Sequence, residues 1–166
     1  MKRTFLLFVL SCFVSISTFG QTNNSIPALS KLINWLNISY SNFDVDVRSI
    51  GFSFEEKKME EKSTNYIYIR QFNKGEYVYT ERIVYKVWNK DNSIVVQLFA
   101  VQDLITIYSS QYASSSFSSY DCEVQPEDNE TAFCYRSKSY QLRVTDKRRT
   151  TEVGGRNEYS ITIFKR

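Results

Sequence analysis

Apolar residues recur every three or four positions in three stretches of the chain, the spacing of an amphipathic helix. The first stretch covers residues 26–36, where Ser25 as a cap and Pro27 in the first turn predict the helix start. The second covers residues 43–50 and is stopped by Gly51. The third covers residues 101–117. The pattern predicts a helix or helix pair near the start and a further helical stretch near the middle.

Runs of alternating apolar and polar residues follow each helical segment and predict antiparallel strands. After the first helices they cover residues 52–54, 64–72, 77–88 and 93–99, with turns at 73–75 and 89–92. After the later helix they cover residues 120–124, 131–135, a long run from residue 140, and 159–164. Gly154 and Gly155 form a two-residue hairpin turn within that part.

The turn at residues 89–92 fixes which side chains of its hairpin share a face. Pairing across Lys90 and Asp91 places these residues on the core face: Ile83, Tyr85, Val87, Ile94, Val96 and Leu98. It leaves Val84, Lys86, Trp88, Val95 and Gln97 on the other face, which is more apolar than a solvated face. The turn at 73–75 allows two or three residues, so the face of the strand at 64–72 stays open.

The order of elements in the second part of the chain repeats that of the first. Residues 50–54 are similar to 119–123, and residues 93–96 to 160–163, at nearly equal offsets. We predict an α+β fold of two tandem units, each a helix or helix pair followed by a three- or four-stranded antiparallel meander. The units span residues 21–99 and 100–166 and pack as one compact domain. Chance similarity between two αβ segments is the alternative.

This layout, with a disulfide in an exported chain, resembles the architecture of the β-lactamase inhibitory protein group. The resemblance lies in the arrangement of elements and in no motif. It favours an inhibitor-like binding protein and transfers no residue role to this chain.

The first twenty residues have the pattern of a secretory signal peptide. Lys2 and Arg3 precede an apolar stretch over residues 4–16, and small residues precede a cut after Gly20. A lipid anchor at Cys12 is disfavoured, because the apolar stretch before it is very short and continues after it. No later run is long enough to span a membrane. The signal and the composition are typical of a bacterial protein, which predicts a secreted or periplasmic location.

Cleavage near Gly20 leaves an even pair of cysteines, Cys122 and Cys134. In an oxidising compartment this pair is expected to form a disulfide. The spacing is not the C-x-x-C of redox-active pairs, so we interpret it as structural.

The chain has 166 residues and no histidine, which excludes Ser-His-Asp and Cys-His catalytic sites and histidine-ligated metals. The Glu55–Glu56 and Glu60–Glu61 pairs lie in a polar hairpin tip, too solvated for a raised pKa. Neither a phosphate-binding glycine loop nor a calcium loop is present. Without the signal, basic and acidic residues are nearly equal in number, so nucleic acid is not implied as a partner. We predict no catalytic residues, no metal and no cofactor.

The predicted strands are rich in tyrosine and tryptophan, which are over-used at binding surfaces. The candidate partner-binding residues are Tyr66, Tyr68, Tyr77, Tyr79 and Trp88. The alternatives are that tyrosine simply suits strands, that two sheets pack on one another, or that the protein forms a homo-oligomer.

Basic residues gather in the last part of the chain, whereas residues 100–134 are acidic. The cluster Lys147, Arg148, Arg149 and Arg156 is a candidate contact for an anion or an acidic partner. Its alternative is pairing with opposite charges on neighbouring strands. The sequence thus predicts an exported, non-catalytic protein-binding module, inhibitor- or immunity-like. A self-associating envelope protein and a carboxylate-only hydrolase of envelope polymers are the alternatives.

Overall fold

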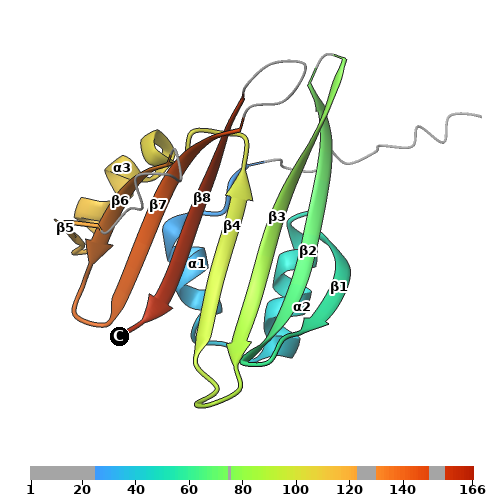
Figure 1. The fold of residues 1–166 in the computed structure, drawn as a ribbon, viewed down its shortest axis with the longest axis horizontal. Coiled ribbons are helices and arrows are strands. Elements are labelled where there is room, and N and C mark those ends of the chain that lie inside the picture. Colours follow the sequence, from blue (N-terminus) through green and yellow to red (C-terminus); the bar gives the residue numbers. More distant parts are fainter. Residues whose placement is uncertain (1–24, 75, 123–129, 150–155) are drawn as a thin grey trace, which may run out of the picture.

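The computed structural model describes residues 25–74, 76–122, 130–149 and 156–166. Within them, three helices and eight strands form a mixed helix and antiparallel-sheet fold that is mostly sheet (Figure 1). The predicted mixed fold is confirmed. The signal peptide with its cut near Gly20, Cys12 and the turn at Gly154–Gly155 lie outside the described residues.

The elements follow the predicted order of helices and strands. The first part holds α1 (Leu29–Trp35), α2 (Tyr40–Ser49), β1 (Ser53–Met59), β2 (Ser63–Lys74), β3 (Tyr77–Trp88) and β4 (Ile94–Ala100). The second part holds α3 (Leu104–Ser114), β5 (Ser118–Tyr120), β6 (Glu130–Arg136), β7 (Tyr140–Arg149) and β8 (Arg156–Lys165).

All eight strands belong to one antiparallel sheet, in the order β1-β2-β3-β4-β8-β7-β6-β5. Strands β1 to β4 are neighbours in chain order, and so are β5 to β8. The last strand of each series, β4 and β8, lie side by side at the centre of the sheet. The helices lie behind the sheet in the view of Figure 1, so they cover one face of the sheet, and no helix of the described residues covers the other.

The hairpin register predicted for residues 83–98 is confirmed. Ile83 pairs with Leu98, Tyr85 with Val96 and Val87 with Ile94. The register of β2 is now fixed as well, because Lys74 pairs with Tyr77 and the connection therefore has two residues. This choice puts the even-numbered residues of β2 on the helix side and the odd-numbered ones on the uncovered side.

The core lies between the helices and the sheet. Its aromatic centre is Phe43 of α2, whose ring lies 5.3 Å from that of Trp35 and 4.3 Å from that of Tyr85. All three side chains are almost entirely removed from water. Each such ring contributes roughly 1.5–3 kcal/mol of hydrophobic stabilisation, so this cluster anchors the helices to the sheet.

The start of α1 differs from the prediction. The helix begins at Leu29, after Ala28, and no side chain caps it. The Leu29 amide instead donates to the Gln111 side chain of α3, at 2.8 Å. A contact from a distant helix therefore replaces the Ser25 cap, and local sequence carries no sign of it.

Candidate partner-binding surface

The sheet face opposite the helices, called the open face below, is defined by strand register. On β2, β3 and β4 it consists of Asn65, Ile67, Ile69, Arg82, Val84, Lys86, Trp88, Val95, Gln97 and Phe99. On β8 and β7 it consists of Ser160, Thr162, Phe164, Gln141, Arg143 and Thr145. These positions alternate with the buried core residues along each strand, so their side chains point away from the helices.

The centre of the open face is apolar. Val84 is 8% exposed, and the neighbouring apolar side chains on β2, β4 and β8 are half-buried: Ile67, Ile69, Val95, Phe99 and Phe164. Gln97 on β4 donates to the Thr162 hydroxyl on β8 at 3.2 Å, so these two polar side chains at the centre hydrogen-bond to each other. The sequence-based expectation that this face is unusually apolar is confirmed.

Two cations of β3 lie over aromatic rings of this face. The Arg82 guanidinium is 4.3 Å from the Phe99 ring centre, and the Lys86 ammonium is 4.6 Å from that of Trp88. In this geometry the aliphatic stem covers apolar surface while the charge stays near water. The rings are therefore shielded by groups that can themselves bind an anion.

The charged open-face positions on the central strands β3 and β7 that are named above, Arg82, Lys86 and Arg143, are all basic. None of the open-face positions on β2, β3 and β4 is a carboxylate. Lys86 lies 3.6 Å from Glu60, which comes from the β1–β2 connection at the margin. On the other side of the centre, Arg143 of β7 pairs with Glu130 of β6 at 2.6 Å and is itself 39% exposed.

Three buried polar atoms of the open face form no hydrogen bond within the described residues. They are Nε of Arg82, Nε of Arg143 and Oδ1 of Asn65. Buried polar atoms are paired in most protein structures, and unpaired ones mark places where the surface is under-satisfied. Both arginines of the open face are among them.

The structure divides the predicted partner-binding residues of β2 and β3 between the two faces of the sheet. Trp88 lies on the open face, but Tyr66 and Tyr68 lie on the helix side. Tyr68 is 0% exposed, and its hydroxyl donates to Asp44 at 2.6 Å and bonds the Tyr40 hydroxyl at 2.9 Å. A buried tyrosine with both hydroxyl contacts inside the molecule does not form part of a surface.

Tyr77 and Tyr79 lie at the beginning of β3, near the end of the long β2–β3 hairpin at the top of Figure 1. Tyr77 is 68% exposed, and Tyr79 stacks on Phe72 with the ring centres 5.6 Å apart. Tyr77 and Tyr79 are thus separated from Tyr66 and Tyr68, which pack further down the sheet.

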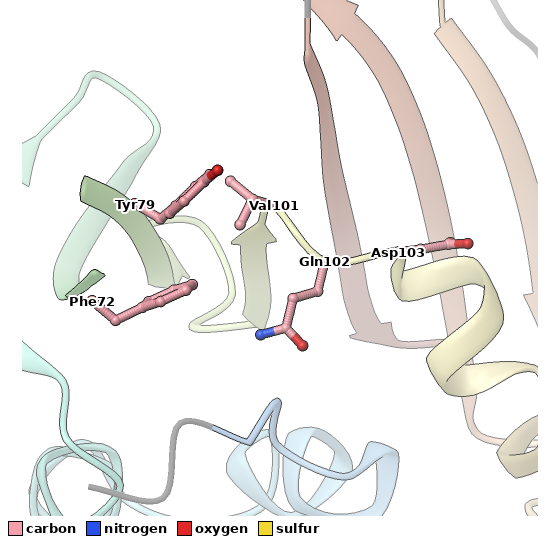
Figure 2. A pocket seen from close by; sticks show the side chains of 5 residues that line it. All are labelled: Phe72, Tyr79, Val101, Gln102 and Asp103. Carbon is pink, nitrogen blue, oxygen red and sulfur yellow. The ribbon is translucent and has the colours of Figure 1, made fainter. Parts of the chain in front are cut away.

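A pocket of about 510 Å³ opens beside this hairpin, between the stacked rings and the chain that leaves β4. Figure 2 shows Phe72 and Tyr79 on one side and Val101 and Gln102 on the other. Gln102 donates to Glu81 at 3.2 Å.

The carboxylate beside this pocket, Asp103, serves as a helix cap. It accepts from the Ile105 and Thr106 amides at 3.0 and 3.1 Å and from the Thr106 hydroxyl at 2.7 Å. The hydroxyl bond is the largest cause that lowers the pKa of Asp103 below its ordinary value. An ionised capping carboxylate of this kind is a poor general acid at neutral pH.

The predicted basic cluster lies at one end of β7 and β8. Lys147 pairs in register with Glu158 on one side and with Glu130 on the other. The backbones of Arg149 and Arg156 pair at the same end. The side chains of Arg148, Arg149 and Arg156 are outside the described residues, so their contact with an anion stays a prediction.

The predicted disulfide is confirmed. Cys122 and Cys134 are bonded and tie the chain after β5 to β6. Such a bond is compatible with an extracellular or periplasmic protein. Among the helices of the described ranges, none is long and apolar enough to cross a membrane.

The sequence interpretation missed the two arginines and the two phenylalanines of the open face: Arg82, Arg143, Phe99 and Phe164. Alternation from Ile83 could have placed Arg82 on that face, and alternation from Leu98 could have placed Phe99. No local pattern reveals that β4 lies beside β8, which brings the remaining two together with them. Comparison of the chain with protein-family models, with curated proteins and with solved structures finds no match.

Proposed function

We propose that this protein is an exported, non-catalytic protein-binding module, inhibitor- or immunity-like, that holds its partner on the open face. The observation that carries the proposal is the half-buried apolar centre around Val95, Phe99 and Phe164, with Arg82 lying over the Phe99 ring and Lys86 over the nearby Trp88 ring. Apolar patches rimmed by polar side chains mark interaction sites in soluble proteins.

The size of the open face supports the proposal. The open face continues onto β6, where Ala132 and Cys134 pair with Thr145 and Arg143, so it crosses six neighbouring strands from β2 to β6. At about 4.8 Å between strands and roughly seven residues of about 3.3 Å, they span roughly 550–600 Å² in projection. In a stable complex each partner buries about 800 Å² of accessible surface. Side chains make the surface uneven, so this accessible area corresponds to a smaller projected area. The face is therefore large enough for a specific interface.

Export rests on the signal pattern of residues 1–20 and agrees with the Cys122–Cys134 bond. We also infer that residues 21–99 and 100–166 are tandem units. What supports this inference is that each half has helix before strands, and that its four strands are consecutive neighbours. The two series meet through their last strands, β4 and β8.

Self-association through the open face is less well supported, because of charge. Two copies packed face to face would bring Arg82, Lys86 and Arg143 of one copy close to the same cations of the other. Like charges that meet in an interface weaken binding by several kcal/mol, which is a large part of the binding free energy of a weak complex. A different protein is the better partner.

The test places a photo-cross-linking amino acid at position 95 of the full chain and recovers adducts from native envelope and medium. We expect a stoichiometric protein adduct that is lost in the Phe99→Ala and Trp88→Ala variants. The matched control is Val45→Ala, since Val45 is 70% exposed on α2 behind the sheet. Full capture by both open-face variants, or loss of capture in the control alone, would refute the proposed surface.

A further inference from the structure

We infer that the partner presents an acidic segment to the open face, and that Arg82 and Arg143 bind two of its carboxylates on either side of the apolar centre. This inference rests on the proposed function and specifies the chemistry of the partner.

Strand register sets the spacing of the two arginines. Arg82 on β3 is opposite Phe99 on β4. Two residues further along β4, Gln97 is opposite Thr162 on β8, which is opposite Arg143 on β7. The two arginines are thus three strand spacings and two residues apart. At about 4.8 Å per strand and 3.3 Å per residue, their backbones are about 16 Å apart.

This spacing defines the segment that would fit. An extended peptide advances about 3.3 Å per residue and points alternate side chains to the same face, so carboxylates about four to six residues apart, at an even separation, would reach both arginines. On a helix, which rises 1.5 Å per residue and has 3.6 residues per turn, the separation on one face would be about eleven residues. The neutral strip of β4 and β8 between the arginines fits apolar side chains lying between the acidic ones.

Arg82 is the better anchor of the two. In the described part of the chain it forms no ion pair, and its guanidinium lies over the Phe99 ring at 4.3 Å. A guanidinium can contact a ring through its face while its Nη nitrogens donate to a carboxylate. Its packing against Phe99 also reduces the side-chain entropy lost on binding.

Arg143 already shares one contact with a carboxylate. Its Nη2 donates to Glu130 at 2.6 Å, while its Nε is buried without a hydrogen-bond partner in the described residues. Glu130 lies at the margin, on β6, and is 15% exposed. The guanidinium has five N–H donors, so an acidic group of the partner can join this pair from the side of the sheet centre.

The test begins with the peptide cross-linked to position 95, identified by mass spectrometry, and with the affinity of the purified partner measured by calorimetry. The Arg82→Glu variant is expected to weaken binding about tenfold to a hundredfold, because it removes a charge-assisted contact and adds repulsion. Exchanging the matching partner carboxylate for arginine is expected to restore binding to Arg82→Glu. Lys90→Glu is the matched control, because it makes the same charge change at an exposed residue of the β3–β4 turn.

Circular dichroism and the unfolding midpoint show whether Arg82→Glu still folds, and Arg82→Gln repeats the test without a new charge. Restored binding in the charge-exchanged pair supports the inference. It is overturned if the cross-linked peptide has no carboxylates at the required spacing, if Arg82→Glu and Arg82→Gln both bind normally, or if the captured material is a nucleic acid or an anionic polysaccharide. Loss of binding in Phe99→Ala together with normal binding in Arg82→Glu would refute the acidic chemistry and leave the proposed function standing.

Discussion

The buried ion pair between Arg70 of β2 and Glu81 of β3 yields a sharp prediction about stability. Their side chains are 3% and 0% exposed, and both nitrogens on one edge of the guanidinium donate to one carboxylate oxygen. Arg70 also donates to the Ile50 carbonyl at 3.1 Å, and Gln102 donates to the second oxygen of Glu81 at 3.2 Å. Every charged atom of the pair therefore depends on the other residue or on a neighbour fixed in place.

Glu81→Leu removes the negative charge and leaves the guanidinium buried without it. Breaking a buried pair by removing one partner costs about 3–5 kcal/mol, because the remaining charge cannot return to water without unfolding. The orphaned Gln102 amide adds to this loss. Since a domain of this size has about 5–15 kcal/mol of stability in total, the variant is expected to be close to unfolding at 37 °C.

Urea unfolding followed by tryptophan fluorescence measures the effect, with buried Trp35 as a reporter of the core. The double variant Arg70→Met/Glu81→Leu is expected to recover most of the lost free energy, because apolar residues of similar size replace a buried pair at little cost. Lys58→Ala is the control, since the 60% exposed Lys58 pairs only loosely with Glu60. The reasoning fails if Glu81→Leu loses less than about 1 kcal/mol, or if the double variant is no more stable than the single one.

Three further predictions concern stability and its pH dependence. Replacing Cys122 and Cys134 by serine is expected to lower the free energy of unfolding by about 3 kcal/mol, measured in urea against the oxidised protein; an unchanged midpoint would contradict it. The Tyr68 hydroxyl is the largest cause that lowers the pKa of Asp44 in the folded state, so this carboxylate stabilises the fold above its ordinary pKa and loses that contribution as pH falls through the lowered value. The stability gap between the protein and Asp44→Asn should therefore narrow below about pH 4, and a constant gap from pH 7 to pH 2 would show that the linkage is absent. Tyr108→Phe removes a buried 2.6 Å hydrogen bond to a backbone carbonyl before α1 and should cost about 1–3 kcal/mol, whereas a loss near zero would show that the bond contributes nothing.

Sequence alone predicted those features that short-range pattern determines. The β3–β4 hairpin was placed in its correct register because its turn is short and polar and both its strands alternate. Helix α2 was placed correctly, since Phe43 and Val47 recur at helical spacing and Gly51 adopts a positive φ of 90° after it.

The parts that sequence did not determine depend on contacts between distant segments. Tyrosine and isoleucine alternate along β2, and both sides of the sheet accept apolar residues. The hydrophobic pattern therefore does not determine whether Tyr68 or Ile67 lies in the core. The two-residue connection that pairs Lys74 with Tyr77 made that choice. Strands β4 and β8 are neighbours in the sheet but are separated by most of the second half of the chain. The residue pattern of neither strand indicates this pairing.

The two faces of the sheet use aromatic residues in opposite ways, and this difference bears on the proposed recognition of a partner. On the helix side, the hydroxyls of Tyr40 and Tyr68 are satisfied inside the molecule, because they bond one another and the Tyr68 hydroxyl donates to Asp44. Such hydroxyls have nothing left to offer a partner, so the tyrosine content of β2 serves packing. On the open face the central rings are Phe99 and Phe164, which have no polar group. Hydrogen bonding to a partner there must come from other side chains, and the cations beside those rings are the strongest donors available. The proposed specificity for an acidic partner therefore rests on where the fold places its arginines and not on its abundance of tyrosine.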